Sequence, residues 1–110
     1  MKIWLDDLRP APLGYEWCHS VSEAKSTILY SEQFCHRRPA DANERNMQID
    51  LIDCDHDLGD YACDGGDGIE LLKWLEKRGS NYPIRLHTMN IVGRTNMQAI
   101  IDHNNWTEVM

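Results

Sequence analysis

The chain has 110 residues, with 18 acidic and 11 basic side chains and a net charge of −7. This length supports one modest hydrophobic core, so we expect a single domain over residues 1–110. The negative charge argues against an extended nucleic-acid binding surface and against acidic membranes, and no apolar run is long enough to span a bilayer.

The four cysteines show neither metal-binding nor redox spacing. The sequence has no Cys-x-x-Cys pair among Cys18, Cys35, Cys54 and Cys63, and its amino terminus has no apolar signal segment. A zinc site and a disulfide framework are therefore not expected. We predict reduced thiols in a cytoplasmic protein, and the sequence does not indicate its oligomeric state.

The chain begins with a short apolar segment that ends in two carboxylates. Residues 2–6 are predicted to form a strand, which places Asp6 and Asp7 at its carboxyl end. The loop that follows contains two prolines and a glycine, which exclude a regular helix there. A second, very short strand is expected at residues 16–18.

A capping pattern predicts the first helix. Ser20 and Glu23 match the S-x-x-E capping box, and the apolar spacing after them predicts a helix that ends near Tyr30. Residues 33–48 are polar, so we expect a surface segment there, with a composition that allows one helical turn near residues 42–47.

The most informative segment covers residues 49–59, IDLIDCDHDLG. Its first half is apolar and β-prone, as in a buried strand, and its second half holds Asp53, Asp55, His56 and Asp57. A strand that runs into carboxylates and a Gly-rich loop is a common way to build a site at the carboxyl edge of a parallel sheet. We therefore expect a functional site at this strand end.

A second capping pattern and a third strand follow. Asp67 and Glu70 match a capping box for a helix that ends at Gly79. Residues 83–90, PIRLHTMN, are predicted to form a strand with polar residues at its end. Like the two earlier strand ends, which carry carboxylates, this end carries polar side chains, here His87, Thr88 and Asn90.

The last part of the chain completes an α/β pattern. Asn90 is predicted to cap a helix over about residues 92–103, and residues 106–109 are expected to form a final short strand. Alternation of apolar strands with amphipathic helices indicates an α/β fold with a mainly parallel, five-stranded sheet.

The carboxylates at the strand ends are the candidate metal ligands. A single Asp more often caps a turn, but like charges brought together repel, and a cation or a shared proton offsets that repulsion. Hard oxygen ligands favour a divalent metal such as Mg²⁺ or Mn²⁺. The candidate ligands are Asp6, Asp7, Asp55 and Asp57.

One calcium motif can be rejected. Asp53, Asp55 and Asp57 imitate the start of an EF-hand loop, but Leu58 stands where that loop needs Gly. The preceding residues also predict a strand, where the motif needs a helix.

Two histidines and several polar groups suit a phosphate. His56 lies between two carboxylates, which favour its charged form and suit it to donate a proton. His87 ends a strand and is open to three interpretations: an acid/base group, a ligand, or a core-edge histidine with a backbone partner. The candidates for holding a phosphate follow the site strands: Arg9, Thr88, Asn90 and Arg94.

The order of these features resembles a response-regulator receiver domain. Asp55 and Thr88 stand at the places of the phosphoacceptor and of a receiver Ser/Thr. Receivers also carry a Lys at the end of their last strand, but no Lys follows Lys77, and the proline-rich loop replaces the first receiver helix. An ordinary phosphorylation switch is therefore not expected.

A closer similarity is to the cyclic-phosphate processing receiver domain family. Its pattern is matched, in order, by KIWLDDLRPAP, DHDLG, GIELLKWLEKRG and HTMNIVGRTNM. Two positions depart from it: Ile91, where Pro would be expected, and Asp53, where the strand would be more apolar. The resemblance implies an α/β, receiver-like (flavodoxin-like) three-layer sandwich with a rebuilt site that acts on cyclic phosphates.

The leading hypothesis is metal-dependent hydrolysis of a small cyclic phosphate, on a nucleotide or at an RNA end. Its catalytic residues would be His56, His87, Asp55 and Asp57. One alternative is a non-catalytic receiver-like module that binds metal or a phosphorylated ligand for signalling, and another is a scaffold with an acidic patch. The histidines beside the carboxylates favour the enzyme, because ring opening needs a proton donor and simple binding does not.

Overall fold

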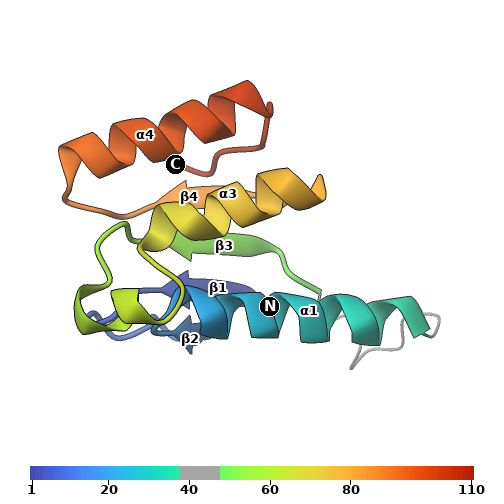
Figure 1. Ribbon diagram of the computed structural model, residues 1–110. Coiled ribbons are helices and arrows are strands. Elements are labelled where there is room, and N and C mark those ends of the chain that lie inside the picture. The colour runs from blue at the N-terminus through green and yellow to red at the C-terminus, as the bar shows by residue number, and fades with distance from the viewer. Residues whose placement is uncertain (38–47) are drawn as a thin grey trace.

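The computed structural model describes residues 1–37 and 48–110, of which residues 34–37 by their backbone only (Figure 1). Four parallel strands form one sheet in the order β2-β1-β3-β4. Their bounds are β1 Lys2–Leu5, β2 Tyr15–Cys18, β3 Leu51–Cys54 and β4 Ile84–Leu86. An isolated parallel bridge between Ile84 and Glu108 stands where we expected a fifth strand.

Three α-helices and one short 3₁₀ helix connect the strands. Their bounds are α1 Val21–Arg37, η1 Gly59–Cys63, α3 Gly68–Arg78 and α4 Ile91–His103. Helix α3 packs between α1 and α4, so the three form a single layer. The two connections that contain helices, β2 to β3 and β3 to β4, advance in the same direction across the sheet, so right-handed crossovers place their helices on the same face. The connection from β1 to β2 runs the opposite way and contains no helix.

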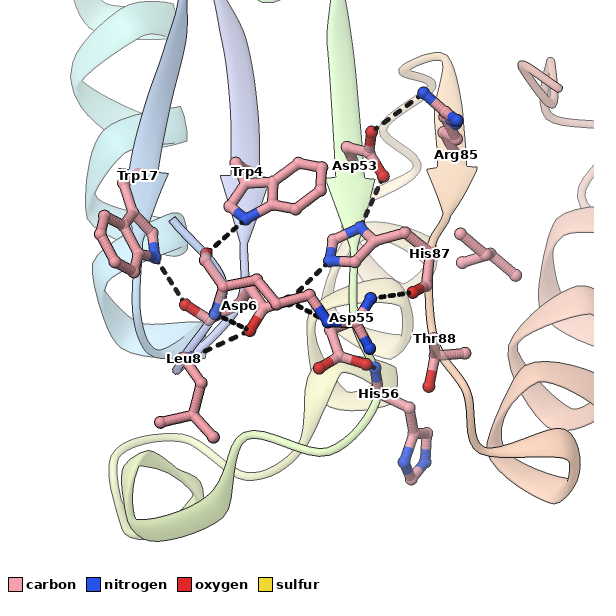
Figure 2. Close-up of polar contacts among 12 residues, drawn as sticks. Trp4, Asp6, Leu8, Trp17, Asp53, Asp55, His56, Arg85, His87 and Thr88 are labelled. Atoms are coloured by element: carbon pink, nitrogen blue, oxygen red, sulfur yellow. Dashed lines mark hydrogen bonds and ion pairs between the residues drawn. The ribbon is translucent and has the colours of Figure 1, made fainter. Parts of the chain in front are cut away.

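The described residues therefore form a receiver-like α/β fold with two layers, whereas we expected three. The physical reason is the predicted loop: the chain passes from β1 to β2 without a helix, so none of the described helices covers the second face of the sheet. Figure 2 looks onto this face, with the helices behind the strands.

The core lies between the sheet and the helix layer. Alternate strand residues, Ile3, Leu5, Ile52, Cys54, Ile84 and Leu86, are buried in one cluster with apolar residues of all three helices. This alternation fixes the register of the parallel strands and so aligns their carboxyl ends. Cys18, Cys54 and Cys63 are free thiols.

The first helix begins as predicted and ends later. Ser20 Oγ accepts a hydrogen bond from Glu23 N at 3.1 Å, and Glu23 Oε2 accepts one from Ser20 N at 2.9 Å, which confirms the capping box. The predicted end near Tyr30 was wrong, because α1 continues to Arg37 and Glu32 accepts a hydrogen bond from Arg78 of α3 at 3.2 Å. The turn expected near residues 42–47 lies outside the described residues.

The other two helices differ in how they begin. Asn90 Oδ1 accepts a hydrogen bond from Gly93 N at 2.9 Å, which confirms the cap of α4. Asp67 precedes α3, but its carboxylate accepts a hydrogen bond from Leu58 N at 3.1 Å, so the second capping box was wrong. Helix α3 ends at Gly79, as predicted, in the left-handed conformation that glycine allows.

The Ser20 cap gives a test of this fold. Ser20→Ala should lower the free energy of unfolding by about 1 kcal/mol or more, because it removes the cap of α1 and a hydrogen bond to Asp64. Urea denaturation measures this change. Ser26→Ala, at an exposed position of α1, is the control and should have little effect. Equal effects of the two changes would contradict the role of the cap.

Candidate functional site

The carboxyl ends of β1, β3 and β4 meet at a pocket of about 360 Å³. The residues that line it are Asp6, Asp7, Leu8, Arg9, Asp55, Asp57, Gly59, Thr88, Met89 and Asn90. The structure thus brings together most of the candidate residues at one edge of the sheet. Three candidates do not line the pocket: His56, His87 and Arg94.

Three carboxylates converge in this pocket. Asp6, Asp7 and Asp55 each offer an oxygen, and these atoms all lie within 4.8 Å of one another. Asp6 and Asp55 are buried, whereas Asp7 is half-buried. Asp57 lies outside this group and forms a second group with His56 and Asp67. Three oxygen donors from three residues match the ligand chemistry of Mg²⁺ or Mn²⁺.

The three carboxylates differ in how many hydrogen bonds they accept. Asp6 Oδ1 accepts hydrogen bonds from the backbone N–H groups of Leu8 and Arg9, at 2.9 and 3.0 Å. Asp55 Oδ1 accepts one from the N–H of His56 at 2.8 Å. The Asp7 carboxylate has no hydrogen-bond partner within residues 1–37 and 48–110. Asp55 also accepts a hydrogen bond from the Thr88 side chain, and Asp6 one from His87. Asp7 is therefore the most open of the three carboxylates, and Asp6 is the least open.

Burial affects the two inner carboxylates in opposite ways. Burial opposes ionisation of Asp6, but hydrogen bonds from Arg9 N, Leu8 N and His87 outweigh it and hold the Asp6 pKa below its usual value. Burial raises the pKa of Asp55, hydrogen bonds from Thr88 and from the His56 N–H offset this only partly, and the charge of Asp6 adds to the rise. A divalent cation beside Asp55 would relieve this cost, so the donor set fits a metal.

A glycine makes room for the open carboxylate. Gly59 begins η1 with φ +54°, and a Cβ at this position would lie 2.5 Å from Asp7 Oδ2. A side chain at position 59 would therefore push the Asp7 carboxylate away from Asp6 and Asp55. Because Gly59 has no side chain, the loop after β3 leaves space in the pocket for the Asp7 carboxylate.

Asp57 is held at the pocket edge by two partners. Its Oδ1 lies 2.8 Å from His56 Nδ1, and both of its oxygens accept hydrogen bonds from Asn90 Nδ2, at 3.1 and 3.2 Å. The contacts with His56 and then Asn90 hold the pKa of Asp57 below its usual value. The His56 ring packs against the start of α4, where a Cβ on Gly93 would lie 2.4 Å from its Cγ.

The His87 ring lies between Asp53 and Asp6 and is not part of the pocket lining (Figure 2). Its Nε2 lies 3.0 Å from Asp6 Oδ2 and its Nδ1 lies 2.7 Å from Asp53 Oδ1. The ring of Trp4 stacks on it, with centroids 3.9 Å apart. Sequence reasoning missed these roles of Asp53 and Trp4, although a carboxylate inside an apolar strand was a visible signal.

The two candidate arginines have different places. Arg9 lines the pocket, and its Nη1 donates to the backbone oxygen of His87 at 3.1 Å. Arg94 donates from Nη1 to the backbone oxygen of Leu86 at 3.2 Å and lies outside the pocket. Arg9 is therefore the arginine that can meet an anion in the pocket.

A parallel sheet in the order β2-β1-β3-β4, with aspartates after its first and central strands, defines a receiver-like domain. The family model of the cyclic-phosphate processing Receiver domain matches residues 1–103, and the chain belongs to this family. Neither a curated protein nor a solved structure matches the chain. Among the described residues, no helix is long and apolar enough to cross a membrane.

The crowded carboxylates predict an unusual stability change. Asp55→Asn should raise the melting temperature in metal-free buffer by a few degrees, because it removes a buried carboxylate with a raised pKa. A raised carboxyl pKa means that folding disfavours the ionised form, so the Asp55 contribution falls as the pH rises above about 4.

Differential scanning fluorimetry with and without Mn²⁺ measures both effects. The metal should raise the melting temperature of the wild type but not that of Asp55→Asn. Asp60→Asn, which removes an exposed charge from η1, should respond to Mn²⁺ like the wild type. An equal Mn²⁺ response in Asp55→Asn would rule out Asp55 as a ligand.

Proposed function

We propose that this domain hydrolyses a small cyclic phosphate, on a nucleotide or at an RNA end, with the help of a divalent metal. The observation that supports this most is the convergence of Asp6, Asp7 and Asp55 in one pocket. Its volume of about 360 Å³ is at the small end of the range for ligand sites, which suits a phosphate and its sugar. Membership of the family supports the same substrate class.

Asp7 and Asp55 would hold the metal, with Asp6 beside them. A bound cation would supply positive charge to an anionic phosphate and make water a better nucleophile at neutral pH. This allows a strongly acidic protein to accept an anion, because the cation reverses the local potential.

Two further groups would hold the phosphate. The contact of Arg9 Nη1 with the His87 backbone leaves the other guanidinium N–H groups at the pocket for phosphate oxygens. Thr88 Oγ accepts a hydrogen bond from Asn90 N at 3.1 Å, and its O–H donates to the Asp55 carboxylate. When a cation takes this place at Asp55, the Thr88 O–H would be able to donate to a phosphate oxygen instead. The Asn90 side chain already contacts Asp57 and Gly93, so we assign it to holding the pocket wall.

The His56–Asp57 pair is our choice for proton transfer. Water adds to phosphorus, the bond between phosphorus and one sugar oxygen breaks, and that oxygen takes up a proton. Asp57 binds Nδ1 of His56, whereas Nε2 has no hydrogen-bond partner in the described part of the chain. Nε2 is therefore the nitrogen that can give up a proton when both ring nitrogens carry one, and the contact of Nδ1 with Asp57, a residue of the pocket lining, holds the ring at the pocket edge.

Turnover assays test the proposal. The protein should open 2′,3′- or 3′,5′-cyclic nucleotides only with Mg²⁺ or Mn²⁺, and Asp55→Asn should abolish this. His56→Gln should lower kcat by about 100-fold or more and remove one limb of the pH profile, since it removes the proton donor. Asp60→Asn is the matched control and should keep full activity.

A phosphorylation assay gives the result that would contradict hydrolysis. If no cyclic phosphate is opened and acetyl phosphate instead labels Asp55, the domain is a phosphate-accepting module and not a hydrolase. Labelling is measured by intact mass, with Asp55→Asn as the unlabelled reference.

A further inference from the structure

We propose that Asp53 and His87 are positioning residues: they fix the turn that presents Asp7 and Arg9 to the pocket. This inference deepens the proposed function and rests on it only where it concerns the metal. It also removes His87 from the set of proton donors, because both of its ring nitrogens contact carboxylates of the protein.

Asp53 lies in the middle of the otherwise apolar β3 and is fully buried. One of its oxygens, Oδ2, has no hydrogen-bond partner among the described residues, and its nearest cation is Arg85 Nη1 at 3.7 Å. A buried, half-satisfied carboxylate destabilises a fold, so an apolar residue would serve β3 better. The unfavourable burial of Asp53 is explained if its carboxylate has a role in the site.

The His87 ring is held between two carboxylates. His87 Nδ1 lies 2.7 Å from Asp53 Oδ1 and its Nε2 lies 3.0 Å from Asp6 Oδ2, so both ring nitrogens are engaged by carboxylates of the protein. The ring is nearly buried, and Trp4 stacks on it with an interplanar angle of 4°. Trp4 is itself tied to the turn, because its Nε1 donates to the backbone oxygen of Arg9 at 2.9 Å. His87 thus has one fixed orientation.

Asp6 connects His87 to the pocket. His87 holds Oδ2 of Asp6, and Oδ1 of the same carboxylate accepts the N–H groups of Leu8 and Arg9. These two hydrogen bonds close the turn after β1. Asp7 lies inside that turn and Arg9 at its end, so both depend on where Asp6 is held. Figure 2 shows this sequence of contacts from Arg85 to Leu8.

The consequence concerns metal affinity. Residues that orient a ligand from behind typically change metal affinity 10- to 100-fold when they are removed. Loss of Asp53 removes the partner of His87 and one negative charge, and both changes weaken cation binding. The stability of the fold should not fall in parallel, since a buried carboxylate is costly.

The test uses Asp53→Asn and Asp53→Leu in the full chain. Mn²⁺ affinity, measured by calorimetry without substrate, should fall about 10-fold or more in Asp53→Leu and less in Asp53→Asn, which keeps an acceptor. Asp53→Leu should melt no lower than the wild type. Asp50→Asn is the control: it removes an exposed charge just before β3 and should bind Mn²⁺ like the wild type.

Unchanged Mn²⁺ affinity in both Asp53 variants would overturn the inference. A wild type that binds no Mn²⁺ would overturn its metal part together with the proposed function.

Kinetics separate positioning from proton transfer. His87→Gln should raise the Mn²⁺ concentration needed for half-maximal activity and keep both limbs of the pH profile, unlike His56→Gln. A lost limb in His87→Gln would make His87 the proton donor and overturn its positioning role. If no cyclic phosphate is turned over, hydrolysis fails, whereas the calorimetric results still decide the role of Asp53.

Discussion

The site edge depends on Asp6 more than on any other residue. Its N–H donates to the backbone of Cys18 in β2, its backbone oxygen accepts from Trp17 Nε1 at 2.7 Å, and its carboxylate contacts His87 after β4. One buried residue therefore joins β1 to strands on both sides of it and also closes the turn that carries Asp7. A residue with so many protein partners is better suited to order a metal site than to act as its main ligand.

The position of the site could be predicted because parallel strands have their carboxyl ends at the same edge of a sheet. Apolar runs that end in Asp6, Asp55 and Thr88 must bring those ends to one edge if the strands are parallel. The direction of His87 could not be predicted in the same way. It depends on which face of the sheet its partner Asp53 occupies, and that follows from strand register, which one sequence does not reveal.

The layer count was missed for a related reason. The proline-rich loop was recognised, but its consequence depends on the strand order β2-β1-β3-β4. In this order the connection from β1 to β2 runs opposite to the other two, so a right-handed crossover helix there would have covered the other face of the sheet. The capping error at Asp67 is local in origin: its carboxylate meets Leu58 N, a partner nine residues away that competes with the helix end. Pattern rules fail here because tertiary contacts use the same side-chain oxygen.

The pocket has a thermodynamic consequence that follows from where its residues lie in the chain. Asp7, Asp55 and Thr88 come from three strand ends, so no locally folded fragment contains the site. A ligand of this pocket binds only the folded chain, and mass action then stabilises the whole domain, by about 2.7 kcal/mol at a free concentration 100 times Kd. The population of unfolded chains in a cell would therefore fall as the free concentration of that ligand rises.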